Sequence, residues 1–253
     1  MQTPVQFASG FASVKVLRIL AAAVMAILTP VNVVGQTNPS APTTHHRAFI
    51  PPVHRVAHNG PFGFERGMTK EQIIALVGSD KVDNELSRDD VIVLTTAPKP
   101  HPAFKEYYLF ISPELGLLKL GATGVDINTN VFGNQVHSKF VEIQVALSAF
   151  YGKPPIVSFD RLRSGSNWRD PQDWMMGLLK EERVLTALWM SRTTHPKDFN
   201  GIEVGSELPN DINVIELEAV ALSTTKGYLR VIYEFDGWDG YVDAKKAKQS
   251  QTF

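Results

Sequence analysis

The segment from Asn134 to Tyr151 constrains the fold of this chain more than any other stretch. Its apolar residues recur at steps of four and three, which places them on one face of an amphipathic helix; they are Val136, Phe140, Ile143, Leu147 and Phe150. Gly152 supplies a left-handed C-terminal turn, and Pro154 and Pro155 cannot continue the helix. A helix with one apolar face buries it against another layer, so we expect a domain built around a packed core.

Two further helices have recognisable ends. Thr69 and Gln72 form a capping box, Gly78 supplies the C-terminal turn, and the residues between them give one apolar face, made of Ile73, Leu76 and Val77. Asp170 is placed to cap a third helix with Pro171 at its first position, running to about residue 183.

Strands are predicted where β-branched and aromatic residues gather. The segments are Val91–Thr96, Phe104–Ile111, Leu115–Ala122, Val184–Ser191, Ile212–Leu222 and Tyr228–Phe235. The strands follow helices in runs, without single βαβ alternation, so we expect an α+β fold with helices packed on one face of an antiparallel sheet. Aligning Gly78 with Gly152 superposes two helix ends, each followed by strands, which allows two tandem helix-plus-meander halves, residues 61–127 and 128–243.

The stretch from Gly67 to Gln72, followed by Leu76, Val77 and Gly78, resembles the opening motif of a known group of small modules. These are the SmpA/OmlA outer-membrane-assembly lipoproteins and the beta-lactamase inhibitor proteins. The resemblance implies a short helical segment before a small antiparallel sheet, arranged twice in tandem in the inhibitors, and a non-enzymatic binding role. The chain departs from the assembly proteins in having no cysteine for a lipid anchor.

Composition excludes several classes of function. The 253 residues include no cysteine, which excludes thiol catalysis, a CxxC redox pair, cysteine-ligated metals and a disulfide framework. The 25 Lys+Arg and 26 Asp+Glu residues give a formal net charge of -1, so no general attraction to nucleic acid is expected.

The N-terminus has the order of a secretory signal. Lys15 and Arg18 precede an apolar run, Ile19 to Val34, and small residues end at Gly35. We therefore predict a signal peptide over residues 1–35, a periplasmic or secreted mature chain with no stable membrane span, and a Pro-, Thr- and His-rich disordered linker over 36–60. The alternative is anchorage to the inner membrane by an uncleaved N-terminal segment. A flexible tail is predicted over residues 244–253.

Motifs for chemistry are missing from the sequence, which lacks a G-x-S-x-G elbow, an H-E-x-x-H pair and a phosphate-binding glycine loop. Three groups leave an alternative open. The linker histidines could bind Zn²⁺ or Cu²⁺, the Asp236–Asp243 segment could bind Ca²⁺, and a Ser–His–Asp triad could be assembled in space. The histidines concerned are His45, His46, His54 and His58 in the linker, and His101, His137 and His195 for the triad. We predict no catalytic residue, no cofactor and no metal site.

Aromatic residues in polar segments are the binding candidates. Trp168 lies in a Ser- and Asn-rich stretch, and Trp238 and Tyr241 share a Gly- and Asp-rich one. Large rings in such segments commonly form binding hot spots. The expected function is therefore a non-catalytic periplasmic binding, inhibitor-like or envelope-assembly module, with another envelope protein as partner. The alternatives are a secreted or periplasmic hydrolase whose site is not visible as a motif, and a purely structural envelope protein.

Overall fold

The computed structural model describes residues 60–152, 155–191, 208–209 and 211–250. The chain divides into two compact units, Met1–His54 and Arg55–Phe253, and all described residues belong to the second. The predicted signal peptide, the four linker histidines and His195 lie outside the described residues. In the part that is described, no helix is long and apolar enough to cross a membrane.

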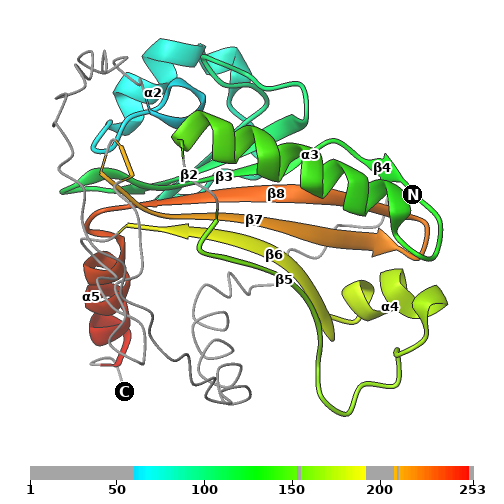
Figure 1. The fold of residues 1–253 in the computed structure, drawn as a ribbon. Helices are drawn as coiled ribbons and strands as arrows, with labels where there is room; N and C mark the ends of the chain where they lie inside the picture. The colour runs from blue at the N-terminus through cyan, green and yellow to red at the C-terminus, as the bar shows by residue number, and fades with distance from the viewer. Residues whose placement is uncertain (1–59, 153–154, 192–207, 210, 251–253) are drawn as a thin grey trace, which may run out of the picture. The chain divides into compact units, whose positions relative to one another are not determined.

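One antiparallel sheet organises the described residues, with the strand order β1-β2-β3-β8-β7-β6-β5 and with β4 also paired to β8 (Figure 1). The strands are β1 (Val91–Leu94), β2 (Phe104–Ser112), β3 (Gly116–Gly124), β4 (Ile127–Asn128), β5 (Val157–Leu162), β6 (Arg183–Met190), β7 (Ile212–Ser223) and β8 (Lys226–Phe235). The α+β class predicted from the sequence is confirmed.

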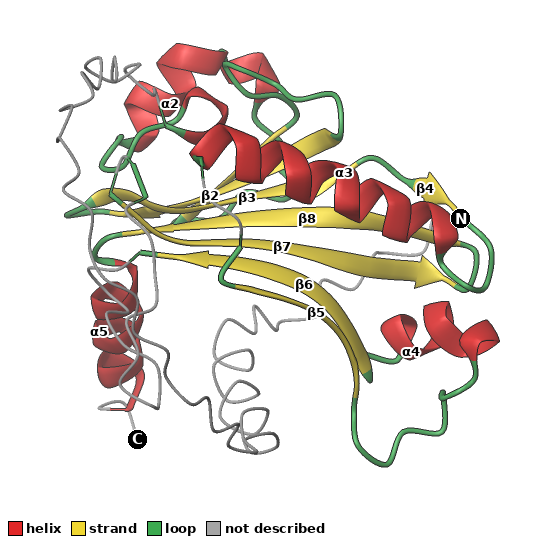
Figure 2. Cartoon of the chain, in the orientation of Figure 1, coloured by secondary structure: helices red, strands yellow, loops and turns green. Residues whose placement is uncertain are grey.

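Helices pack against this sheet (Figure 2). They are α2 (Lys70–Val77), α3 (Asn134–Tyr151), α4 (Trp174–Leu179) and α5 (Trp238–Ser250), with 3₁₀ turns η1 (Pro61–Gly63), η2 (Ser79–Lys81) and η3 (Pro171–Asp173). Helix α3 contacts β7 and β8, and α4 contacts β6 and β7. We call the side of the sheet that α3 covers the helical face and the opposite side the second face.

The two predicted halves occupy separate blocks of the sheet. Strands β1, β2 and β3 lie together at one end, β5 to β8 lie together at the other, and the blocks meet where β3 pairs with β8. In each block the strands run from an outer edge toward the middle, after the helix that precedes them in the chain. The halves therefore share one sheet, and a duplication of sequence stays a prediction.

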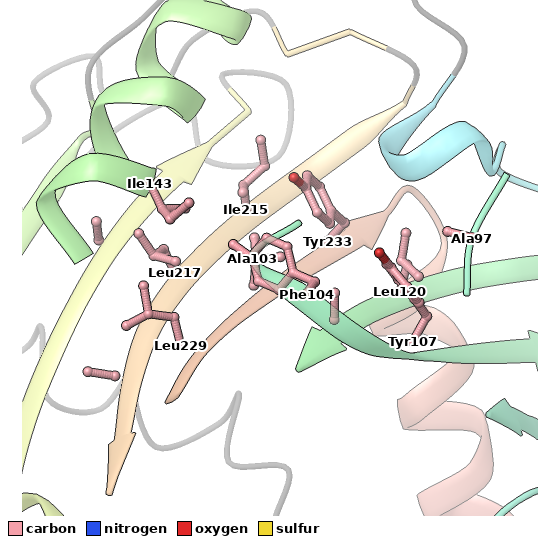
Figure 3. Packing of buried hydrophobic residues seen from close by; sticks show 14 of the residues in the cluster. Ala97, Ala103, Phe104, Tyr107, Leu120, Ile143, Ile215, Leu217, Leu229 and Tyr233 are labelled. Carbon is pink, nitrogen blue, oxygen red and sulfur yellow. The ribbon is translucent and has the colours of Figure 1, made fainter. Parts of the chain in front are cut away.

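The core lies between the helical face and its helices. Alternate residues of β7 and β8 are buried, and Leu217, Leu229 and Tyr233 among them are at most 3% exposed. Figure 3 shows Ile143 of α3 on the same side of the sheet as Leu217 and Leu229. Val136, on the same face of α3 as Ile143, is also buried. The helix and the sheet thus exclude water from each other's apolar side chains, which is the main favourable term in folding.

Local sequence signals explain the helix ends. The capping box of α2 is confirmed, because the Gln72 N–H donates to Thr69 Oγ1 at 3.3 Å and the Thr69 N–H donates to Gln72 Oε1 at 2.8 Å. Helix α3 has the predicted bounds and follows Gly133, which has a φ of 72°. A Cβ at position 133 would lie 2.0 Å from the Trp174 ring, so only glycine fits there.

Two residues expected on buried helix faces are exposed instead. Leu76 of α2 is 48% exposed and Phe150 of α3 is 57% exposed. Phe150 lies in the last turn of α3, seven residues beyond Ile143, the last buried residue of that helix. Leu147, between them, is only partly buried against the core. Periodicity identified the correct face, but it carries no information on where the helix leaves the core.

Three elements differ most from the expectations, apart from the short strand β4, which was also not predicted. The residues after Asp236, predicted as a glycine-rich turn and a flexible tail, form α5 as far as Ser250. The predicted third helix is divided into η3 and α4 and ends at Leu179, near Glu181 with its positive φ of 55°. Strand β5 was not predicted, because its polar residues interrupt the apolar run.

Candidate functional site

Two of the three predicted binding residues meet at one end of the sheet. The ring centroids of Trp238 and Tyr241, in the first turn of α5, lie 5.9 Å apart, and Phe110 of β2 lies edge-on to Trp238 at 5.5 Å. All three side chains are half-buried. They line a pocket of about 170 Å³, which we call the corner pocket. Its lining residues are Asp90, Phe110, Trp238, Tyr241, Val242, Lys245 and Lys246.

The strand register places Phe110 in this pocket. Phe110 pairs with Val91 on one side and Lys119 on the other, and the neighbouring Leu109 belongs to the buried core. Because side chains alternate between the two faces of a strand, Phe110 faces the second face, where α5 crosses it. Residues more than a hundred positions apart thus form one aromatic cluster.

The start of α5 is held by a charged turn. Gly237, with a φ of 92°, lets the chain turn directly after β8. The Arg66 Nε–H donates to the Asp236 carbonyl at 2.9 Å, and the Arg66 guanidinium pairs with the carboxylates of Asp211 and Asp236 at 3.3 and 3.5 Å. This turn fixes the position of Trp238 relative to β2 and β3.

A second set of contacts holds the following turn of α5. Lys245 Nζ forms an ion pair with the Asp90 carboxylate, to which the Tyr241 hydroxyl also donates at 3.3 Å. The hydrogen bond from Lys245 lowers the pKa of Asp90, and the same bond raises the pKa of Lys245. Burial raises the pKa of the Tyr241 hydroxyl. Asp90 directly precedes β1, so these contacts tie α5 to the outer strand of the sheet.

A buried ion pair lies beside the pocket. Lys119 Nζ lies 2.7 Å from Glu234 Oε1 and 4.8 Å from the centre of the Trp238 ring, so it makes both an ionic and a cation–π contact. The Lys119 and Glu234 side chains are 2% and 9% exposed. The ring of Trp238 therefore rests on a paired charge, which leaves little net electrostatic attraction at this point.

Farther along the second face, the carboxyl group of Glu216 lies between two ion pairs. Glu216 of β7 is 6% exposed and lies opposite Ile232 and Leu188 on the neighbouring strands. Burial, together with the negative charges of Glu218 and Glu234, raises the pKa of Glu216 to about 8. Glu218 pairs with Arg230, as Glu234 pairs with Lys119.

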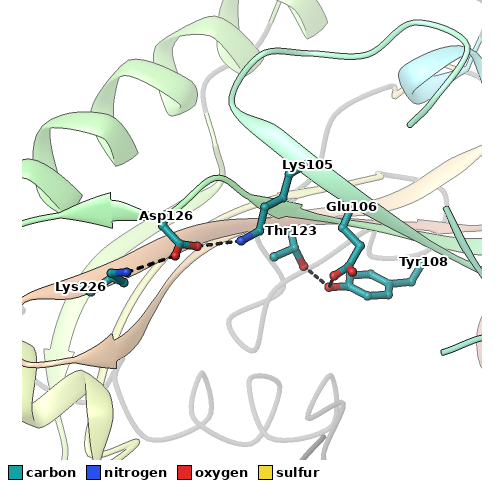
Figure 4. Close-up of polar contacts among 6 residues, drawn as sticks. All are labelled: Lys105, Glu106, Tyr108, Thr123, Asp126 and Lys226. Atoms are coloured by element: carbon teal, nitrogen blue, oxygen red, sulfur yellow. Dashed lines mark hydrogen bonds and ion pairs between the residues drawn. The ribbon is translucent and has the colours of Figure 1, made fainter. Parts of the chain in front are cut away.

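Other polar contacts tie neighbouring strands together near the middle of the sheet (Figure 4). The Tyr108 hydroxyl donates to Glu106 Oε2 at 2.7 Å and also contacts the Thr123 hydroxyl, and burial raises the pKa of Tyr108. The Asp126 carboxylate bridges Lys105 at 2.7 Å and Lys226 at 3.5 Å. These groups satisfy one another across strands β2, β3 and β8.

The structure does not bring Trp168 to the corner pocket. It lies in the loop between β5 and η3, where its backbone N–H donates to Ser166 Oγ at 3.1 Å and its side chain is half-buried. Trp168 stays a separate candidate for partner binding.

The residues considered for a catalytic triad have structural contacts. His137 Nε2 lies 3.3 Å from Asp160 Oδ2, and the same carboxylate accepts hydrogen bonds from Trp174 Nε1 and Arg183 Nη1, each at 2.7 Å. Among the described residues no serine hydroxyl bonds to His137. His101 Nδ1 accepts from the Ala103 N–H in a turn. The pair of His137 and Asp160 ties α3 to β5.

The aspartates considered for Ca²⁺ are divided among other partners. Asp236 pairs with Arg66, and Asp243 lies 3.5 Å from Lys246. In the described ranges, no group of three His, Asp or Glu side chains is placed to hold a metal ion.

Sequence reasoning missed Phe110, Asp90 and Lys245. The alternation of Glu106, Tyr108 and Phe110 along β2 was a usable signal for the second face. Nothing local in the sequence joins that face to α5, because the contact depends on how the sheet is ordered.

Comparisons with protein-family models, with curated proteins and with solved structures gave no match.

Proposed function

We propose that this chain is a non-catalytic binding module that holds a protein partner at the corner pocket. The supporting observation is that Trp238, Tyr241 and Phe110, from distant segments, line one half-open pocket. Aromatic rings that are half-buried before binding offer a large apolar contact at a small cost in side-chain entropy.

The pocket favours a particular kind of partner residue. About 170 Å³ accommodates a single aliphatic or aromatic side chain. Lys245 and Lys246 stand at the rim, and Lys246 is 59% exposed. Both lysines are already paired, Lys245 with Asp90 and Lys246 with Asp243, so an apolar anchor fits the site in shape. The signal-like N-terminus and the resemblance of residues 67–78 to inhibitor and assembly modules support another envelope protein as this partner.

The test is quantitative capture of the partner from envelope extract by the full chain and its variants. Trp238→Ala should weaken capture about 30-fold, since truncating a central aromatic anchor typically costs ~2 kcal/mol. Leu222→Ala is the matched control, because Leu222 is a large apolar residue of β7 that is 50% exposed outside the pocket. Trp168→Ala shows whether the second candidate takes part.

A second variant separates binding from folding. Val242 lines the corner pocket, so Val242→Trp adds a bulky ring there and should block capture while the far-ultraviolet circular dichroism stays native. Normal capture by both Trp238→Ala and Val242→Trp would contradict the proposal.

A further inference from the structure

The outer edge of β5 carries backbone groups that have no partner among the described residues. The Arg163 N–H donates to the Glu182 carbonyl at 2.7 Å, at the end of the ladder that joins β5 to β6. Backbone groups alternate in direction along a strand, so those of Phe159 and Arg161 also face β6. The N–H and C=O groups of Ser158, Asp160 and Leu162 point the other way, and within the described ranges nothing bonds to them.

The other edge of the sheet is closed by its own chain. On β1, the Val93 carbonyl accepts from the Asp83 N–H at 2.9 Å, and the Val93 N–H donates to Ser87 Oγ at 3.0 Å. Val91 and Arg88 exchange backbone hydrogen bonds, and the Thr95 N–H donates to the carbonyl of residue 81 at 3.0 Å. The chain therefore has a means of covering an edge and uses it at β1.

The carboxylate of Asp160 on β5 does not protect the open edge against pairing with another strand. Sheet edges are commonly protected by charged side chains that repel another strand. The Asp160 carboxylate is instead held on the helical face by Arg183, Trp174 and His137, and its side chain is only 26% exposed. Asp160 as a whole is nevertheless exposed, because its backbone faces outward. The edge is open, and the negative charge of Asp160 is neutralised on the helical face.

We propose that β5 pairs antiparallel with β5 of a second copy of this chain across a twofold axis, which joins the two sheets. An antiparallel edge is self-complementary about such an axis, because each strand offers the other the same alternation of donors and acceptors. The partner is thus a second copy of the chain, and this interface is separate from the corner pocket at the other end of the sheet.

Hydrogen bonding and charge select one register. The outward groups belong to Ser158, Asp160 and Leu162, so these residues must face one another across the axis. Two registers overlap nearly the whole strand. One sets Asp160 opposite Asp160, which brings like charges together. The other sets Ser158 opposite Asp160 and Phe159 opposite Phe159, which makes an aromatic cross-strand pair on the second face. The proposed dimer has the second register.

The absence of cysteine from the chain makes this register directly testable. In the proposed dimer the two copies of residue 159 form a non-hydrogen-bonded pair with Cα atoms about 4.5 Å apart. Phe159→Cys in the full chain should therefore form a disulfide-linked dimer under mild oxidation. Arg161→Cys is the matched control: it lies on the same strand and face, but its two copies are offset by four residues, roughly 14 Å, beyond disulfide reach.

Sedimentation velocity over a range of concentrations provides the second measurement. The wild-type chain should dimerise reversibly, and Ser158→Pro should raise the dimer dissociation constant at least 10-fold. Proline at 158 removes an outward N–H and no bond to β6. If Ser158→Pro fails to fold, the two cysteine variants still decide the question. A wild-type chain that stays monomeric, or equal crosslinking through residues 159 and 161, would overturn the proposal.

Discussion

The two edge strands of the sheet differ in whether their outward backbone groups are hydrogen-bonded. At the β1 end, residues 81–88 hydrogen-bond to the outer strand, and α5, tied to Asp90, forms the corner pocket beside it. At the β5 end, no described residue bonds to the outward backbone groups. The backbone of one outer strand is therefore satisfied within its own chain, whereas the outward groups of the other remain available for pairing with another strand.

The sequences of the two edge strands match their surroundings. Residues 91–94 are all apolar, and Ile92, Val93 and Leu94 are at most 3% exposed. An apolar strand of this kind would promote aggregation if its edge were bare. β5 instead alternates apolar and polar residues over most of its length and is nowhere fully buried. The apolar composition of β1 fits an edge that is covered by other residues, and the mixed composition of β5 fits an edge that is exposed.

The largest change in unfolding free energy is expected for a substitution on β7, one of the strands that join the two ends of the sheet. The pKa of Glu216, raised to about 8 by burial, lies above its value in the unfolded chain. Its contribution to stability is therefore complete below about pH 4.5 and is lost as the pH rises through 8. Glu216→Gln removes that loss and should make the protein more stable than wild type at pH 9 by more than about 2 kcal/mol.

Chemical denaturation at pH 5 and pH 9 measures this difference. Glu218→Gln is the control, because Glu218 is paired with Arg230 and its loss should destabilise the fold at both values. If wild type and Glu216→Gln show the same pH dependence of stability, Glu216 is hydrated in the folded state and the second face of the sheet is open to water at this position.

Next in size is the loss of a buried side chain at the closed end. Ile92→Ala should cost about 2 to 5 kcal/mol of unfolding free energy, because Ile92 is fully buried and leaves a cavity. Val157→Ala on β5 should cost under about 1 kcal/mol, since Val157 is only half-buried. Equal costs in urea denaturation would remove the contrast between the two ends.

A smaller change in stability is expected when the serine beside each edge strand is replaced by alanine. Ser87→Ala leaves the Val93 N–H without its acceptor and should cost about 1 to 3 kcal/mol. Ser158→Ala removes an exposed hydrogen bond to Gln144 and should change stability by less than about 0.5 kcal/mol. Thermal unfolding of the two variants side by side measures the contrast, and a larger loss for Ser158→Ala would reverse it.

The smallest effect concerns the attachment of α5. Because Lys245 lowers the pKa of Asp90, their pair stabilises the fold fully above about pH 3.8, and this stabilisation is lost as the pH falls through the lowered pKa of Asp90. The pair is largely exposed, so Lys245→Met should cost under about 1 kcal/mol at pH 7 and progressively less as the pH is lowered below 3.8. Lys248→Met, on the same helix, is the control. Denaturation followed by circular dichroism measures the stability of both variants, and identical curves would show that the ion pair does not hold α5.

The sequence predicted those parts of the fold that depend on local signals. Glycines and a capping box mark the ends of α2 and α3, and these signals act within a few residues. Strands with continuous apolar or aromatic content, such as Tyr228–Phe235, were also recognisable. β5 was missed because Asp160 and Arg161 stand in its middle, and the interactions that keep Asp160 there come from α3, α4 and β6.

The candidate site was only half predictable for the same reason. Trp238 and Tyr241 stood out by their neighbours in the sequence, but the partner that makes them a cluster is Phe110 on β2. Gly237 and Gly240 suggested a loop, whereas helix α5 forms because Arg66, Asp90 and Lys119 hold its first turns against the sheet. Such long-range contacts leave no local pattern.

Residue-resolved amide hydrogen exchange tests the contrast between the two ends most directly. In dilute solution the amides of Ser158, Asp160 and Leu162 should exchange rapidly, while those of Val91 and Val93 are protected. Raising the protein concentration should slow exchange at the amides of Ser158 and Asp160, which face each other in the proposed register, and leave the β1 amides unchanged. Slow exchange at β5 at the lowest concentration, or rapid exchange there at every concentration, would contradict an open, self-pairing edge.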